Sequence, residues 1–373
     1  MKENKEAIEG ILHLAEVFKD NPEGFIGIVE ALPGSERDKG ILFLVVGNKL
    51  FDHSYFTVAQ AFYERALKYF IKNNDRANEA ACYGNEAAAY VKMGNFNKAF
   101  VFCNKSLKIF KEINDKKGEA VAYRDMGGAY AASGNFAKSL ESYDKAIEIF
   151  KDTCDKSGAA LCYASSGDVY FHSGDFQETI RVYKKALEIF KDIGSEEHEA
   201  NCYKNMGNAY YNLGDVNKAL VFYNKSLDIA RALSDRTEEG RCYGNIGAAY
   251  AAIDDHTMAI EFYNKSLDIA KETNNSVEML VEYTNLGISY GASGEGAKAI
   301  RFHEKALAIA GYIRDRAKEP VIYLNLGAAY ENLGRFNKAI ECYKKSRSLN
   351  KEIGNRAVND MLNIKFIELK KYL

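Results

Sequence analysis

The stretch CYGNIGAAYAAIDDHTMAIEFYNKSLDIA, residues 242–270, carries the pattern that decides the fold of this 373-residue chain. Its first half places Ile246, Gly247 and Tyr250 three, four and seven residues after Tyr243. Residues at these spacings lie on one face of a helix, so the first half predicts a helix with one apolar side.

The second half repeats this spacing after a short turn, from Ala259 to Leu267, and predicts a second helix. Gly247 and Ala259 are expected on the facing sides of the two helices, where larger side chains would push the backbones apart. Tyr243 and Tyr263 supply bulk, and we expect them to fill the gap to the next hairpin.

The same pattern recurs every 40 residues along the chain. One tyrosine column consists of Tyr83, Tyr123, Tyr163, Tyr203, Tyr243, Tyr283 and Tyr323. The repeat glycines between it and a second tyrosine column are Gly127, Gly167, Gly207, Gly247, Gly287 and Gly327, with Ala87 in the first copy. A single hairpin cannot bury both of its apolar faces, so the copies are expected to gain stability by stacking on one another.

The connections between helices carry stop and start signals. Gly94 and Asn95 stand in the turn inside a copy, where Gly ends a helix in the left-handed conformation and Asn caps the next one. Between copies, Asp235 precedes Glu238 by three residues, which is typical of a helix start. Each 40-residue unit is therefore predicted to be a helical hairpin.

This pattern resembles the tetratricopeptide repeat, which has aromatic, Leu, Gly, Tyr, Ala, aromatic and Ala residues at matching offsets, over about residues 40–356. The usual unit has about 34 residues, whereas the unit here has 40. Units of this length are similar to those of cell-polarity adaptors that link G-protein subunits to spindle proteins, and to those of kinesin light chains. The G-protein-binding motifs of the polarity adaptors are not found in this sequence. The resemblance implies an all-α, right-handed superhelical α-solenoid of stacked antiparallel helical hairpins.

The repeat register divides the chain into four parts. Residues 1–37 are predicted to form a divergent N-terminal helical pair, and residues 38–79 a degenerate first repeat that keeps Gly47. Residues 80–356 hold seven 40-residue repeats, and residues 357–373 are predicted to form a capping helix with a charged outer face. Because no Gly/Ser/Pro-rich linker separates these parts, one continuous solenoid is expected.

Composition narrows the function. Lys and Arg total 50 and Asp and Glu total 52, a net charge of −2 that argues against nucleic acid as the main partner. No apolar run of membrane-spanning length and no signal peptide is evident, which favours a cytoplasmic protein without membrane insertion. Four of the seven cysteines share one repeat position, which predicts small buried thiols rather than metal ligands. No cofactor or metal site is expected.

A ladder of polar residues marks the candidate binding surface, because the first helix of each repeat is expected to line a concave groove. The ladder, two residues before each repeat glycine, reads Asn85, Asp125, Ser165, Asn205, Asn245, Asn285 and Asn325. A side-chain amide can pair with both the N–H and the C=O groups of an extended peptide. Similar ladders in related repeat proteins hold ligand backbones, and the resemblance implies this role for Asn205, Asn245, Asn285 and Asn325, and more weakly for Asn85. The alternative is that these amides bond between neighbouring helices.

Charged residues adjoin the ladder. Arg124, Lys204 and Arg241 favour a ligand with acidic residues. Asp125 and Asp168 oppose them, so the groove is expected to be mixed in charge.

The groove is also expected to vary in width. Phe171 and Tyr211 add bulk in two repeats. Small residues follow between residues 241 and 332, where Gly291 and Ala292 among others leave space for a ligand side chain or helix.

Charges elsewhere in the repeat predict structure rather than chemistry. Glu86 interrupts an otherwise apolar column, and we expect it to reach water or a partner group because an unpaired buried charge is costly. A lysine column on the second helices is predicted to be a solvated convex face, and four of its members can pair with acids three residues later, namely Glu148, Glu188, Asp228 and Asp268. Its members are Lys105, Lys145, Lys185, Lys225, Lys265, Lys305 and Lys345.

No nucleophile–base pair or pair of catalytic carboxylates occurs in a suitable context, so an enzyme is not expected. The sequence favours a scaffold or adaptor that binds a peptide or helical segment of a partner protein in its groove. A peptide-sensing regulatory receptor is an alternative. A co-chaperone with a carboxylate clamp is another, for which Lys204, Asn205, Arg241 and Asn245 offer partial material. The partner and the oligomeric state stay open.

Overall fold

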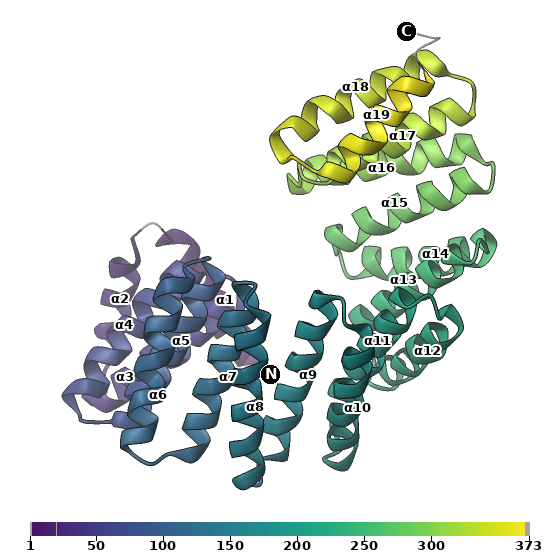
Figure 1. The fold of residues 1–373 in the computed structure, drawn as a ribbon. Coiled ribbons are helices and arrows are strands. Elements are labelled where there is room, and N and C mark those ends of the chain that lie inside the picture. Colours follow the sequence, from purple (N-terminus) through teal and green to yellow (C-terminus); the bar gives the residue numbers. More distant parts are fainter. Residues whose placement is uncertain (1, 20, 370–373) are drawn as a thin grey trace. The chain divides into compact units, whose positions relative to one another are not determined.

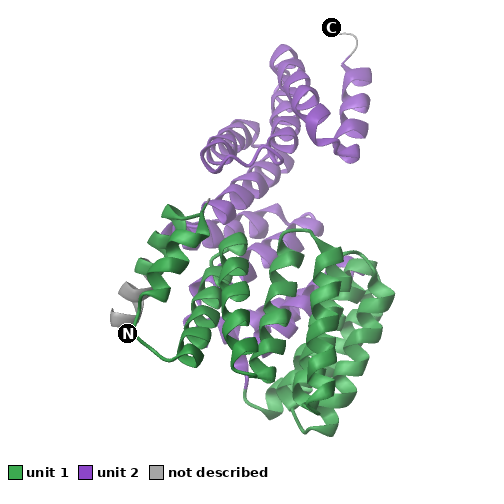
Figure 2. Cartoon of the chain, turned by 90° about the vertical axis from the view of Figure 1, so that its left-hand side faces the viewer, with its two compact units in different colours: residues 1–194 green, residues 195–373 purple. Residues whose placement is uncertain are grey.

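The computed structural model describes residues 2–19 and 21–369, and within them it contains nineteen α-helices and no strand (Figure 1). The helices fall into two compact units, residues 1–194 and residues 195–373, which Figure 2 distinguishes by colour. Unit 1 contains α1 (Lys2–Val17), α2 (Pro22–Glu30), α3 (Glu36–Asp52), α4 (Phe56–Lys72), α5 (Arg76–Lys92), α6 (Phe96–Glu112), α7 (Lys116–Ala132), α8 (Phe136–Asp152), α9 (Lys156–Ser173) and α10 (Phe176–Asp192).

Unit 2 continues the same pattern of helices. It contains α11 (Glu196–Asn212), α12 (Val216–Ala232), α13 (Arg236–Ala252), α14 (His256–Glu272), α15 (Ser276–Ala292), α16 (Gly296–Ile313), α17 (Glu319–Asn332), α18 (Phe336–Ile353) and α19 (Arg356–Glu368). From α3 to α18, each odd-numbered helix, here called an A helix, pairs with the following B helix in an antiparallel hairpin. The predicted all-α class and repeated hairpins are confirmed.

The turn inside each hairpin is built as the sequence predicts. Gly94 has a φ of +73°, which ends α5, and the side chain of Asn95 then accepts a hydrogen bond from the backbone N–H of Lys98 at 3.3 Å. Asp255 caps α14 in the same way, although its turn has Asp254 at the left-handed position with a φ of +60°. Asp tolerates this conformation better than most residues with a side chain. Local sequence therefore sets where each helix ends.

Close packing inside each hairpin depends on the repeat glycine. A Cβ atom added to Gly247 would lie 2.7 Å from the ring of Tyr263, so a larger residue would displace that ring. Tyr263 also joins a buried cluster with Tyr283 and Leu286 of the next hairpin. It therefore fills the gap that the sequence assigned to it and also covers the glycine of its own hairpin. The residues at this position form the ring column, namely Tyr63, Cys103, Tyr143, Tyr183, Tyr223, Tyr263, His303 and Tyr343.

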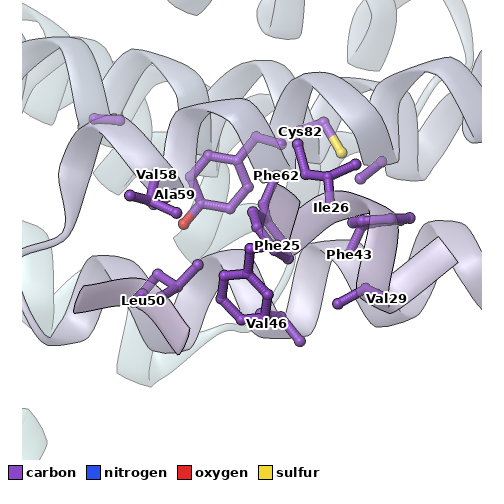
Figure 3. Packing of buried hydrophobic residues seen from close by; sticks show 14 of the residues in the cluster. Phe25, Ile26, Val29, Phe43, Val46, Leu50, Val58, Ala59, Phe62 and Cys82 are labelled. Carbon is purple, nitrogen blue, oxygen red and sulfur yellow. The ribbon is translucent and has the colours of Figure 1, made fainter. Parts of the chain in front are cut away.

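The first hairpin of unit 1 is covered by α2 (Figure 3). Phe25 of α2 packs against Phe62 of α4 with ring centroids 4.8 Å apart, and Phe43 of α3 lies 5.5 Å from the same ring. All three side chains are buried, and each stabilises the fold by about 1.5–3 kcal/mol through burial. The divergent helix α2 thus closes an apolar face that a terminal repeat would otherwise expose.

The last helix, α19, covers the end of unit 2. Val358 and Leu362 of α19 are buried against the α17–α18 hairpin. The expected charged outer face is wrong in part, because Ile364 and Ile367 are exposed on it. Lys370 and Lys371, which the sequence also assigned to that face, lie outside the described residues.

The lysine column has a packing role that the sequence did not reveal. The ammonium group of Lys265 lies 4.6 Å from the ring centroid of Phe262 and 5.8 Å from that of Tyr243. The same residue pairs with Glu261, four residues earlier, at 2.6 Å. The predicted pairing with an acid three residues later is therefore wrong for Lys265. Exposed cation–π contacts of this kind contribute about 0.5–1 kcal/mol.

Glu86 contradicts its expected environment. Its side chain is 1% exposed, and Oε1 is buried without a hydrogen-bond partner among the described residues. Burial raises the pKa of this carboxyl to about 8. The prediction that Glu86 must reach water or a partner is wrong because the group can be buried in its neutral, protonated form.

Candidate peptide-binding face

The exposed side of the A helices carries the candidate site, and we call this side the A face. In unit 2 it is lined by residues spaced four, three and four apart, which lie on one side of a helix. Helix α11 contributes Asn201, Asn205, Asn208 and Asn212; α13 contributes Arg241, Asn245, Ala248 and Ala252; α15 contributes Val281, Asn285, Ile288 and Ala292; α17 contributes Val321, Asn325, Ala328 and Asn332. All of these residues are exposed or half-buried.

The four unit-2 ladder amides are half-buried on four successive A helices. The amide of Asn205 donates to Asn201 Oδ1 at 2.6 Å, within the same helix. Asn285 donates to Glu282 Oε2 at 3.5 Å, also within its own helix. The side chains of Asn245 and Asn325 make no hydrogen bond to any part of the chain that the structure describes. Two amides of the ladder are thus left available to a ligand.

The ladder residue of unit 1 behaves differently. Asn85 on α5 donates to Asn48 Oδ1 on α3 at 3.0 Å. This bond joins neighbouring helices, which is the alternative role that the sequence left open. Asn85 therefore has a structural partner that competes with any ligand.

The predicted basic residues are largely paired. Lys204 is 17% exposed and its ammonium group lies 2.7 Å from Glu238 Oε1, between α11 and α13. Arg241 lies 3.5 Å from Oε2 of the same carboxylate but keeps 52% of its side chain exposed. In unit 1, Arg124 pairs with Asp125 at 3.0 Å. Of the three cations, only Arg241 combines high exposure with a shared partner.

Glu238 is a member of the site that sequence reasoning used only as a helix-start signal. Its backbone N–H does donate to the cap Asp235 Oδ1 at 3.0 Å, which confirms that signal. Its side chain, however, holds Lys204 of the preceding A helix. Contacts between repeats depend on helix rotation, which the 40-residue pattern does not report.

Two hollows open on the A faces, one in each unit. The unit-2 hollow has a volume of about 170 Å³ and is lined by Gly287, Ile288, Gly291, Ala292, His303, Asn325, Ala328, Ala329 and Asn332. The unit-1 hollow has a volume of about 370 Å³ and is lined by Phe51, Ala88, Val91, Lys92, Arg124, Asp125, Gly128, Ala129, Ala132, Tyr143 and Ser165. Gly291 and Ala292, where the sequence predicted space, lie in the unit-2 lining.

The two hollows differ in the helices that line them. The unit-2 hollow lies between α15 and α17, at the hairpin whose ring-column residue is His303. The unit-1 hollow is lined by residues of four A helices, α3, α5, α7 and α9, and by the ring-column residue Tyr143 of α8. In other hairpins the tyrosine hydroxyl reaches the A face, as Tyr223 does when it donates to Asn208 Oδ1 at 2.9 Å. His303 is shorter than tyrosine, so the phenol that would extend toward the unit-2 hollow is missing there.

His303 forms part of the unit-2 lining and has no polar partner. It is 2% exposed, and its Nδ1 is buried without a hydrogen bond to the described residues. Its ring lies against Gly287, which also lines the hollow. Burial lowers the pKa of His303 to about 4, so the imidazole is neutral at neutral pH. The break that His303 makes in the tyrosine column is the signal that the sequence offered for this residue.

The described residues contain neither a metal-binding cluster nor a membrane-spanning helix. No cluster of three or more His, Cys, Asp or Glu side chains within the described ranges could hold a metal ion. In the same ranges, no helix combines the length and the apolar character needed to cross a membrane. The seven cysteines are free thiols, of which six are buried, as predicted for the four in the repeat column.

Stacked helical hairpins of this kind define the α-solenoid class of repeat proteins. The family model described as "Tetratricopeptide repeat" matches residues 83–152, 158–232, 199–272 and 278–352, which together exceed half of the chain. The chain therefore belongs to the tetratricopeptide repeat family, as the sequence predicts.

Several solved structures share this fold. The apo form of the quorum sensor NprR from B. thuringiensis has a TM-score of 0.61 and 17% identity, over 93% of this chain and 99% of that one. A Rap protein complexed with Competence and Sporulation Factor has a TM-score of 0.54 and 16% identity, over 90% and 98%. A STAND protein with a tetratricopeptide repeat sensor from Pyrococcus horikoshii has a TM-score of 0.63 and 20% identity, over 84% and 48%. At these identities the likeness concerns the fold alone. None of the curated proteins compared with the chain matches it.

Proposed function

We propose that the A face of unit 2 binds an extended peptide segment of a partner protein, with the amides of Asn205, Asn245, Asn285 and Asn325 holding its backbone. One observation carries the proposal: these amides stand half-buried on four successive A helices, and two of them have no partner within the described chain. An amide both donates and accepts hydrogen bonds, so each can pair with the N–H and C=O groups of an extended peptide.

The spacing of the A helices suits such a ligand. Packed helices lie on the order of 10 Å apart, and an extended chain advances about 3.3 Å per residue. Successive ladder amides would then meet about every third residue, so four amides span a segment of roughly nine residues. This geometry favours an extended ligand over a helical one, whose backbone groups are already bonded to each other.

Charge adds a preference near α13. Lys204 and Arg241 share the single carboxylate of Glu238, which leaves about one positive charge there. An acidic ligand residue near Arg241 would be favoured, mainly through faster and more specific association. A carboxylate clamp is less well supported, because Lys204 is mostly buried and already paired.

A peptide-sensing receptor is the second candidate. It is supported by the similarity in fold, over nearly the whole of both chains, to a quorum sensor and to a Rap protein complexed with a signalling factor. Small-angle scattering separates the two candidates. A sensor changes its radius of gyration when a short peptide binds, whereas a rigid scaffold does not.

The binding test starts from nonapeptides selected from a random library on the wild-type chain. The variant with Asn205, Asn245, Asn285 and Asn325 all changed to Ala is then compared with the wild type. At about 1 kcal/mol for each hydrogen bond, the loss of four bonds predicts roughly a thousandfold weaker binding. Fluorescence anisotropy measures the affinity, and circular dichroism checks that the variant is folded.

The matched control changes Asn224 and Asn264, which bond to carbonyl groups of their own B helices, to Ala. The control variant is expected to bind the selected peptides like the wild type. Equal affinity of the fourfold variant and the wild type would contradict the proposal. A library that yields no binder would contradict it as well.

A further inference from the structure

We propose that the unit-2 hollow is a specificity pocket that receives a tyrosine side chain of the ligand, with the phenol hydroxyl hydrogen-bonded to His303. This inference rests on the proposed function, because it assigns the chemistry of one ligand residue on the same A face. Three properties of the hollow carry it: its size, its neutral lining and the unpaired imidazole.

The size matches an aromatic ring. The hollow measures about 170 Å³, and a cavity of roughly 150 Å³ in a protein core is known to accept benzene. It lies in the hairpin whose ring-column residue is His303, whereas the preceding and following hairpins carry Tyr263 and Tyr343. A ligand phenol would restore the kind of ring that this hairpin lacks.

The lining favours a neutral side chain. Ile288, Ala292 and Ala328 supply apolar contacts, and Asn325 and Asn332 add uncharged amides. No residue that lines the hollow carries a formal charge at neutral pH, since the His303 imidazole is neutral there. A ligand carboxylate or ammonium group would lose its hydration without gaining a counter-ion, which is unfavourable.

The imidazole of His303 favours a ligand ring that carries a hydroxyl group. His303 Nδ1 is buried and has no partner among the described residues, and a buried polar atom without a hydrogen bond is costly. A neutral imidazole has one nitrogen that donates and one that accepts, whereas a hydroxyl does both. Because Nδ1 itself has almost no accessible surface, the imidazole must turn to present a nitrogen to the hollow. A phenol can then bond to it in either tautomer, whereas a phenylalanine side chain cannot.

The neighbouring hairpins show that a phenol fits this architecture. Tyr263 lies over Gly247 in the preceding hairpin, just as His303 lies over Gly287. The variant His303→Tyr therefore places the usual residue of the ring column into its usual position. It should fold while filling the hollow from inside the protein, which makes it a clean test.

The first experiment uses p-cresol as the probe and toluene as its analogue without a hydroxyl. Methyl NMR follows Ile288, Ala292 and Ala328 during each titration. In the wild type we expect saturable shifts with p-cresol and at least tenfold weaker binding of toluene. His303→Tyr should abolish both responses. The absence of saturable binding in the wild type, or unchanged binding in His303→Tyr, would overturn the proposal.

A second variant separates the effect of the space in the hollow from the effect of the hydrogen bond to His303. His303→Leu keeps an apolar hollow but removes the imidazole, so p-cresol should lose its advantage over toluene. Tyr263→Phe, in the preceding hairpin, is the matched control and should leave both titrations unchanged. A tenfold preference for p-cresol that persists in His303→Leu would refute the role of His303.

The peptide library distinguishes this proposal from the proposed function. Peptides selected on the wild type should carry tyrosine at one fixed position, and peptides selected on His303→Tyr should not. Peptides that depend on the asparagine ladder but show no tyrosine preference would overturn the pocket and leave the proposed function intact. Saturable p-cresol binding without any selected peptide would support the pocket and refute the proposed function.

Discussion

The A faces of the two units use the same repeat for different surfaces. Unit 2 presents Asn205, Asn245, Asn285 and Asn325, whereas the unit-1 ladder reads Asn85, Asp125 and Ser165. Each unit has a hollow on its A face, but the unit-1 hollow is about 370 Å³ with an ion pair in its lining, and the unit-2 hollow is about 170 Å³ with an uncharged lining.

The comparison separates two kinds of position. Repeat glycines, ring-column tyrosines and helix caps are alike in both units, because the stacking of hairpins requires them. The A face varies between the units, and each unit uses it for its own contacts between helices, such as Asn85–Asn48 and Lys204–Glu238. The same amide four times in succession on unit 2 is what the proposed role in holding a peptide backbone predicts.

The largest effects should be equal in the two units, because they concern the shared scaffold. Tyr143→Ala in unit 1 and Tyr263→Ala in unit 2 each remove a buried ring that covers a repeat glycine. Each substitution should cost about 3–5 kcal/mol. Hydrogen exchange should show faster opening of the altered hairpin and its neighbours. A loss below about 1 kcal/mol in either unit would contradict the role assigned to the ring column.

The next effect is the pH dependence of stability, which should cover a different pH range for Glu86 in unit 1 than for Glu282 in unit 2. Burial raises the pKa of Glu86 in unit 1 to about 8 and that of Glu282 in unit 2 to about 7. In each case the folded state holds a proton that the unfolded state releases near its ordinary pKa, so stability falls as pH rises above about 4.5. The decrease in the free energy of unfolding should be complete near pH 8 for the Glu86 contribution and near pH 7 for the Glu282 contribution.

Glu282 has the smaller shift because the hydroxyl of Ser266 donates to its Oε1 at 2.9 Å. Urea unfolding of the wild type, Glu86→Gln and Glu282→Gln between pH 5 and 9 tests both windows. Each amide variant should remove its own part of the pH dependence. Stability of the wild type that rises with pH across this range would show that the carboxyls are buried in their charged form.

A smaller contrast concerns the ladder itself. Asn85→Ala breaks the bond to Asn48 and should cost about 1 kcal/mol of stability. Asn245→Ala removes no internal bond and should change stability by less than about 0.5 kcal/mol, while it weakens peptide binding about fivefold. Thermal melting and anisotropy measure the two effects. A stability loss for Asn245→Ala together with a binding loss for Asn85→Ala would contradict the different roles assigned to the two residues.

The smallest effect should again be shared. Lys145→Ala removes an ammonium group that lies over the ring of Tyr123, and Lys265→Ala removes one that lies over the ring of Phe262. Each should cost about 0.5–1 kcal/mol and leave peptide binding unchanged. A binding loss in either variant would move the candidate site from the A face to the B helices.

Sequence reasoning reached the parts that local chemistry determines. The 40-residue period predicted the hairpins, Gly94 and Asn95 predicted a turn and a cap, and the family follows from the same columns. It missed features that depend on distance across repeats. The Lys204–Glu238 pair requires the rotation of two helices, and the burial of Glu86 requires a raised pKa. The sequence predicted space at Gly291 and Ala292, but the part that His303 plays in lining it depends on the position of its ring over Gly287.

The most direct test of the central claim follows the side-chain amide resonances of the ladder asparagines by NMR while a library-selected nonapeptide is added. The account predicts saturable shifts of the Asn205, Asn245, Asn285 and Asn325 amides, and no shift of the Asn85 amide. A bound peptide that shifts Asn85, or that leaves the four unit-2 amides unchanged, would contradict it.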